Sequence, residues 1–175
     1  MDVRDMTARC LSQMWPMVDR ATKTLSQAEL DRMPGAESNP IGWTFYHMGR
    51  VEDRWFHLLD GNSQQTWEKG WAQRLGMDPD PSLSGSQMTP QEIAAKFKSP
   101  PAEQLKGYAD AVHAEAMAFL QRMPLETLGE EIEAFGGRKM TRGHILAHVV
   151  NEMNQHGGQI AYIKGLLKGY QGRVV

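Results

Sequence analysis

Apolar residues recur every three or four positions in four long stretches of the chain, and this spacing predicts four long helices. We expect these helices over about residues 2–23, 40–60, 99–122 and 142–168. No stretch alternates apolar and polar residues in a way that predicts a β-strand. Four long helices with one apolar face each are typical of an all-α four-helix bundle.

Capping residues mark the expected helix ends. Asn39 is expected to cap the second helix with Pro40 at its first position, and Thr141 is expected to cap the last helix, which Gly169 follows. Two pairs with capping-box spacing predict short additional helices: Ser26 with Glu29, and Thr89 with Glu92.

The connections are less regular. Residues 61–88 are rich in glycine, proline and serine, and only Trp67 and Trp71 offer large apolar side chains. We expect a long crossover that packs back onto the bundle through these two rings. Residues 124–140 are expected to form an extended connection. Ordinary up-and-down bundles have short loops, so the bundle is predicted to have an irregular topology with a long crossover.

The first helix is predicted to carry its core residues on one stripe, and Pro16 is expected to kink or shorten it. The residues of this stripe are Val3, Met6, Cys10, Met14 and Met17.

Composition narrows the class of protein. The 175 residues are 41% hydrophobic and 23% charged, which is ordinary for a globular protein and predicts a single domain over residues 1–175. The net charge of −2 comes without a basic stripe, which argues against nucleic-acid binding. The lone Cys10 excludes an intrachain disulfide and favours a cytoplasmic location. No signal peptide and no membrane-spanning run are evident, so we expect a soluble protein.

The last predicted helix carries a glutamate and a histidine on its apolar face. Each residue advances about 100° around a helix, which puts Glu152 at about 80° and His156 at about 120° on a wheel whose apolar face is centred at about 130°. His148 and His144 lie at the edge of that face. Polar residues recur at positions 144, 148, 152 and 156. Among them, only Glu152 and His156 combine a spacing of four residues with an inward orientation.

Two interpretations of this pair remain open from the spacing alone. An unpaired buried carboxylate would take up a proton or destabilise the fold. Glu152 and His156 could therefore be a hydrogen-bonded pair with a structural role, or two ligands of a divalent metal.

A third metal ligand would have to come from another helix. His47 borders the apolar face of the second helix and is the best candidate by geometry, whereas His57 points away from that face and His113 is expected to be exposed. Glu52 also falls on the apolar side. It could be an acceptor for a ligand, a competing ligand, or an ordinary ion-pair partner.

Three stretches carry a resemblance to a known family. "NPIGWTFYHMGRVEDRWFHLLDG" and "TRGHILAHVVNEMNQHGGQIAYIKGLLKG" resemble the second and last helices of the DinB superfamily, and "MTPQEIAAKFKSPPAEQLKGYADAVHAEAMAFL" is similar to its central segment. The resemblance implies an irregular four-helix bundle whose metal ligands are His47, Glu152 and His156. The glutamate in this set resembles the mycothiol-dependent maleylpyruvate isomerase branch.

The resemblance also implies a function. We expect a thiol-dependent S-transferase or isomerase in which mycothiol, bacillithiol or glutathione binds a zinc, nickel or iron ion and attacks a small-molecule substrate. His148 is the candidate base or substrate contact, and Trp43 or Tyr46 would form a wall of the pocket. A homodimer is expected by the same resemblance. The alternatives are a metal-dependent hydrolase that activates water and a non-enzymatic metal-binding dimeric scaffold.

Overall fold

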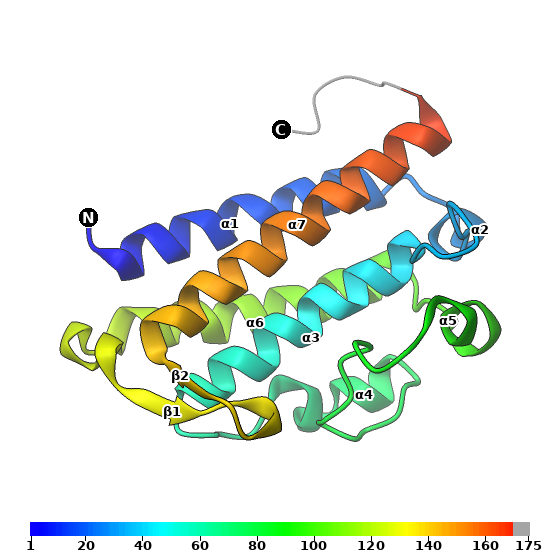
Figure 1. Cartoon of the computed structure of the whole chain (residues 1–175). Coiled ribbons are helices and arrows are strands. Elements are labelled where there is room, and N and C mark those ends of the chain that lie inside the picture. The colour runs from blue at the N-terminus through cyan, green and yellow to red at the C-terminus, as the bar shows by residue number, and fades with distance from the viewer. Residues whose placement is uncertain (170–175) are drawn as a thin grey trace.

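Four long helices form the body of the protein in a computed structural model, which describes residues 1–169 (Figure 1). They are α1 (Val3–Thr22), α3 (Ile41–Leu59), α6 (Ala102–Arg122) and α7 (Arg142–Lys168). The short elements are α2 (Gln27–Leu30), η1 (Thr66–Lys69), α4 (Trp71–Arg74), α5 (Pro90–Lys96), η2 (Leu125–Gly129), β1 (Glu131–Glu133), η3 (Phe135–Gly137) and β2 (Lys139–Thr141). The predicted all-α four-helix bundle is confirmed, and residues 170–175 of the predicted domain lie outside the described residues.

Each long helix packs against two others, so that α1, α7, α3 and α6 follow one another around the bundle (Figure 1). The helices α3 and α6 run in the same direction. Arg50 meets Tyr108 near the middle of the two helices, and Asp60 meets Arg122 at the carboxyl end of both. Two consecutive long helices that run parallel need a connection as long as the bundle. Residues 60–101 form this connection, which explains why the chain has a long crossover.

Several predicted helix ends are confirmed. The Thr141 side chain accepts a hydrogen bond from the backbone N–H of His144 at the start of α7. Both predicted capping boxes are present, at the start of α2 and of α5. These caps use contacts within four residues, so they can be recognised in the sequence.

Two predicted helix starts were wrong by a few residues. Pro40 has an extended backbone, with ψ at 159°, so α3 begins one residue later and Asn39 does not cap it. The third long helix begins at Ala102 rather than at Ser99-Pro100. A residue that precedes a proline is disfavoured in a helix, and Pro101 therefore delays the start.

The connection at residues 124–140 contains a short antiparallel hairpin, which the sequence pattern did not predict. Strands β1 and β2 pair with Ile132 opposite Met140, and Gly136 and Gly137 form the bend with φ near 75°. Strands of three residues are too short to show an alternating pattern.

The predicted core stripe of α1 was largely wrong. Met6 is 53% exposed, and of the predicted stripe only Met14 is buried. Pro16 is exposed and does not shorten α1, which continues to Thr22. The residues that face the core are Thr7, Leu11, Met14, Trp15, Val18, Ala21 and Thr22.

Among residues 1–169, none of the helices combines the length and the apolar character needed to cross a membrane.

A buried ion pair fastens the crossover to α3. Arg50 Nη1 lies 3.0 Å from Asp53 Oδ2, both side chains are completely buried, and the Tyr108 hydroxyl donates to the same carboxylate oxygen at 2.6 Å. Asp53 also accepts hydrogen bonds from two backbone N–H groups of η1 at 2.9 Å. Arg50 donates to the carbonyl groups of Pro81 and Leu83 at 2.8 and 2.9 Å. One charge pair thereby holds two stretches of the crossover, at residues 66–67 and 81–83.

We expect Asp53→Ala to lower the free energy of unfolding by about 3–5 kcal/mol, because it leaves the buried Arg50 guanidinium without its counter-ion. Urea unfolding followed by circular dichroism measures the change. Arg122→Ala is the matched control, since it removes an exposed ion pair with Asp60 and should change the stability by about 1 kcal/mol or less. Equal losses in the two variants would contradict the role assigned to the buried pair.

Candidate metal centre

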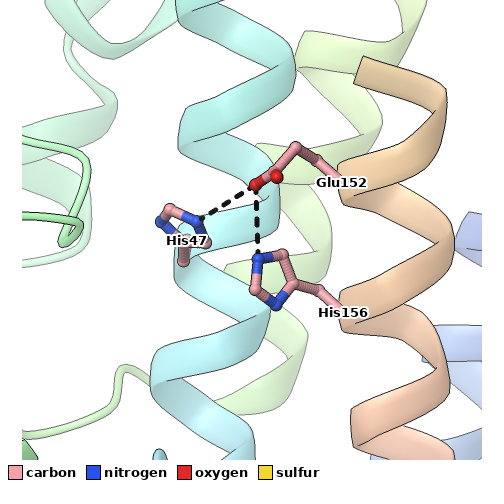
Figure 2. A group of neighbouring side chains, drawn as sticks. All are labelled: His47, Glu152 and His156. Carbon is pink, nitrogen blue, oxygen red and sulfur yellow. Dashed lines mark ion pairs between the residues drawn. The ribbon is translucent and has the colours of Figure 1, made fainter. Parts of the chain in front are cut away.

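The three predicted metal ligands lie next to one another where α3 and α7 pack together (Figure 2). His47 projects from α3, and Glu152 and His156 project from successive turns of α7. Glu152 Oε2 lies 3.9 Å from His47 Nε2 and 3.4 Å from His156 Nε2. One potential ligand atom from each residue lies within 4.8 Å of the other two. Two helices thus supply the trio of side chains.

The antiparallel register of α3 and α7 explains why these residues meet. Arg142, at the start of α7, donates to the Leu59 carbonyl at the end of α3 over 2.7 Å. At about 1.5 Å per residue, His47 lies about 18 Å from this contact along α3, and Glu152 and His156 lie about 15 and 21 Å from it along α7. Along the helix axes, His47 therefore lies midway between Glu152 and His156.

Both histidines have one ring nitrogen occupied and the other turned towards Glu152. The Nδ1 atom of His47 lies 2.7 Å from the carbonyl oxygen of Ser84, and that of His156 lies 2.8 Å from Oε1 of Gln159. Each of these oxygens only accepts, so each Nδ1 carries the hydrogen and, in the neutral ring, each Nε2 keeps a free lone pair. This is the tautomer that a metal-binding histidine needs.

The charges of the trio favour an ionised carboxylate. The hydrogen bond from His156 and, next, the interaction with His47 hold the pKa of Glu152 well below its usual value. Burial lowers the pKa of His156, but the hydrogen bonds to Glu152 and Gln159 outweigh it, and the net shift is upward. Without an ion, the proton on His156 therefore satisfies Glu152, and a metal would replace that proton.

The side chain of Trp43 lies beside that of His47. Its indole stacks on the His47 ring, with the centroids 4.9 Å apart and the planes at 9°. The backbone of Gly85 lies so close to the indole that a Cβ atom at this position would be 3.0 Å from the ring. The indole Nε1 is buried and has no hydrogen-bond partner within residues 1–169. A buried N–H without a partner is rare in proteins, and it leaves a donor beside His47.

The donor set fits a divalent ion. Two ligand atoms that each lie about 2.1 Å from a tetrahedral metal are about 3.4 Å apart. Glu152 Oε2 lies 3.4 Å from His156 Nε2, which equals this value, and 3.9 Å from His47 Nε2, which is half an ångström longer. Two imidazoles and one carboxylate also match the chemistry of open, three-ligand metal sites.

The other predicted site residues, among them His148 and Tyr46, do not belong to the trio, and each has its own contacts. His148 is half-buried one turn before Glu152, and its ring contacts Trp55. The Tyr46 ring packs between Trp67 and Phe97, each 5.7 Å away between ring centroids. The roles predicted for His148, Tyr46 and Trp43 stay predictions.

Two predictions about the remaining histidines need correction. His113 is only 20% exposed, because its Nδ1 lies 3.0 Å from Oε1 of Glu52. His57 was predicted to point away from the apolar face, but it is buried, because Ser63 and Thr66 of the crossover contact its ring. Its Nε2 also lies 3.2 Å from Asp53. Glu52 is completely buried. It is an ion-pair partner of His113, which agrees with one of the three roles left open for it.

Sequence reasoning missed the two groups that orient the imidazoles. Gln159 stands three residues after His156 on the same helix, so the spacing could have identified it. Ser84 contributes a backbone carbonyl from an aperiodic loop, and no signal in the sequence marks such a contact.

The comparisons with known proteins concern the family and the fold. The family model described as the DinB superfamily matches residues 11–160 of the chain. A crystal structure of a conserved protein from Enterococcus faecalis is similar over 97% of this chain and 99% of that chain, with a TM-score of 0.84 and 24% sequence identity. None of the curated proteins matches the chain. The predicted homodimer and the predicted cytoplasmic location stay predictions.

The stability of the metal-free protein should depend on pH through the pair of Glu152 and His156. A lowered carboxyl pKa stabilises the fold above the unfolded value of 4.5, and a raised histidine pKa stabilises it below the unfolded value of 6.5. The contribution is therefore largest between these two values and is lost as the pH falls through the pKa of Glu152 or rises through that of His156.

Urea unfolding of the chelator-treated wild type and of His156→Gln measures this effect. Since both side chains are partly exposed, we expect a difference of about 1 kcal/mol or less at its maximum. His144→Gln, at an exposed position of α7, is the control and should show no such maximum. A difference for His156→Gln that grows steadily above pH 6.5 would contradict the assigned shifts.

Proposed function

The chain belongs to the DinB superfamily, and we propose that it is a metal-dependent enzyme that uses a low-molecular-weight thiol in a transfer or isomerisation reaction. In this proposal His47, Glu152 and His156 hold the ion. Zinc is the ion we expect, with nickel or iron as alternatives, because imidazole nitrogens and a carboxylate oxygen suit all three.

The observation that carries the proposal is the convergence of one carboxylate oxygen and two Nε2 atoms, whose rings are each held by a hydrogen bond at Nδ1. His47 and His156 each bond an acceptor through Nδ1, so rotation of either ring would break a hydrogen bond. A purely structural pair of Glu152 and His156 would not need a third, pre-oriented imidazole from another helix. Groups that orient the ligands are a regular feature of metal sites.

The ligand count favours catalysis over a structural role. Three protein ligands leave at least one coordination position open, as catalytic sites require. A divalent ion lowers the pKa of a thiol or water bound to it, which makes a nucleophile available near neutral pH. In the proposal, His148 takes up the proton that is released, and the unpartnered Nε1 of Trp43 donates to the bound nucleophile or substrate.

A cleft beside the trio could hold the rest of a thiol or substrate. It has a volume of about 430 Å³ and lies between residues 34–39 and the second half of α7. Gln159 lines this cleft and also bonds His156, so this one side chain connects the cleft to the trio, of which no member lines the cleft itself. Its polar lining includes Glu37, Ser38 and Asn39, which suits a hydrophilic molecule. The volume is within the range of small-molecule sites.

We expect the purified protein to bind one divalent ion per chain and Glu152→Ala and His156→Ala to bind it at least 10-fold more weakly, because each loses a ligand. Elemental analysis and zinc titration against a coloured chelator measure the change. His144→Ala, which removes an exposed histidine from the same helix, should bind the ion as the wild type does. Stoichiometric metal in both ligand variants would overturn the assignment.

We expect the zinc-loaded protein to bind one of mycothiol, bacillithiol and glutathione and to conjugate it to an electrophile, with both properties lost in Glu152→Ala. Calorimetric titration with each thiol and an assay of thiol consumption measure them. Thiol-independent ester or amide cleavage that needs the metal would replace the proposal with a hydrolase. A metal that raises the melting temperature without thiol binding or turnover would indicate a scaffold.

A further inference from the structure

A second polar cluster lies on the side of the bundle formed by α1 and α6. Glu52 of α3 is completely buried, and its Oε1 atom lies 3.0 Å from Nδ1 of His113. The other ring nitrogen of His113 lies 3.1 Å from Oγ of Ser12. The second oxygen of Glu52 accepts a hydrogen bond of 2.6 Å from Nε1 of Trp15. A hydroxyl, an imidazole and a carboxylate from three helices thus form one chain of hydrogen bonds.

The chemistry of the three groups decides the direction of the hydrogen bonds. An ionised carboxylate only accepts, so His113 Nδ1 carries a hydrogen and, in the neutral ring, Nε2 is an acceptor. Ser12 therefore donates its hydroxyl hydrogen to Nε2. The sulfur of Met117, at 3.7 Å from Oγ, is a much weaker acceptor. This order of donors and acceptors is the one in which an imidazole activates a serine.

We propose that Ser12 is a nucleophile that accepts the acyl group of an activated ester, with His113 as its base and Glu52 as the group that orients the imidazole. The proposal concerns residues outside the candidate metal centre and does not depend on the function proposed above.

A cleft gives Ser12 access to a substrate. It has a volume of about 300 Å³, and both Ser12 and His113 line it. The charged residues in its lining are Asp19, Asp110 and Lys106, and because Lys106 pairs with Asp110, the net negative charge of the cleft comes from Asp19. Pro16, also in the lining, has no N–H to donate to the Ser12 carbonyl, which therefore loses its usual helical partner. The carboxylate of Asp19 and the carbonyl oxygen of Ser12 favour an ester that carries an ammonium group.

The proposed reaction proceeds in two steps. The Ser12 oxygen bonds to the carbonyl carbon while its proton moves to His113 Nε2, and the alcohol leaves with that proton, so that an acyl-serine remains. Water then attacks the acyl carbon and gives a proton to His113, and His113 passes that proton to the Ser12 oxygen as the acid leaves, so that both the serine and the neutral imidazole are regenerated. Ser12 lies inside α1, where backbone N–H groups bond within the helix. We therefore expect turnover only for esters with good leaving groups.

A second group of a serine, a histidine and a carboxylate provides an internal control: Ser63, His57 and Asp53. The Ser63 hydroxyl oxygen lies 2.8 Å from Nδ1 of His57, whose Nε2 lies 3.2 Å from Asp53. The Ser63 hydroxyl also has the carboxylate of Asp60 as a hydrogen-bond partner, which competes for its proton. The cleft beside His57 is lined by Asp60 and Glu115 but not by Ser63. Ser63 should therefore be unreactive.

Labelling with a fluorophosphonate tests the proposal, because the serine oxygen displaces fluoride and keeps the phosphonyl group. We expect labelling of wild type at Ser12, found by peptide mass spectrometry, and full labelling of Ser63→Ala. Ser12→Ala should not be labelled. His113→Gln, which keeps a polar side chain at this partly exposed position, should be labelled at least ~100-fold more slowly because the base is lost.

Hydrolysis of a nitrophenyl ester with an ammonium group on its acyl chain should be equally fast in wild type and Ser63→Ala, slower in His113→Gln and absent in Ser12→Ala. A chelator should leave it unchanged. This arm separates the proposal from the metal-dependent function, since each can fail without the other. Absence of labelling in the wild type, labelling at another serine, or labelling of Ser12 that is equally fast in His113→Gln would overturn the proposal.

Discussion

The buried ion pair between Arg50 and Asp53 is the constraint on which the arrangement of the site depends. Two completely buried charges are tolerated only when each is paired and hydrogen-bonded, and here the partners are supplied by the crossover. The pair therefore does more than join α3 to α6. It fixes the path of an aperiodic segment up to Leu83, and the next residue, Ser84, presents its carbonyl to His47. Leu83, which helps to stabilise the fold, and Ser84, which orients His47, are thus adjacent in the chain.

The two glutamates that face inward show how packing assigns different roles to one residue type. Glu52 is enclosed, and both of its oxygens are used by side chains of α1 and α6. Glu152 keeps some contact with solvent and faces Nε2 of His47 and of His156. In the neutral rings each of these nitrogens has a lone pair that a metal ion can bind. Glu52 therefore orients a histidine, and Glu152 is suited to an ion. Both inferences follow from which atoms are already satisfied.

The bundle places these two clusters on different helix pairs, although both use α3. His47 faces α7 and Glu52 faces α1 and α6, five residues apart on one nearly fully buried helix. A helix that is buried on all sides has several inward faces, and each face can hold polar groups if the neighbouring helix satisfies them. This explains why α3 carries so many buried polar residues without loss of the fold.

The sequence by itself determined the helices and the pairing of residues along them. Caps such as Thr141, and the four-residue spacing of Glu152 and His156, act within one or two turns, and helix geometry converts them directly into positions. Only the tertiary structure decided which face of α1 is buried, that Glu52 meets His113, and that Ser84 orients His47. These contacts join residues far apart in the chain, and their geometry depends on how helices and an aperiodic crossover pack, which no local pattern encodes.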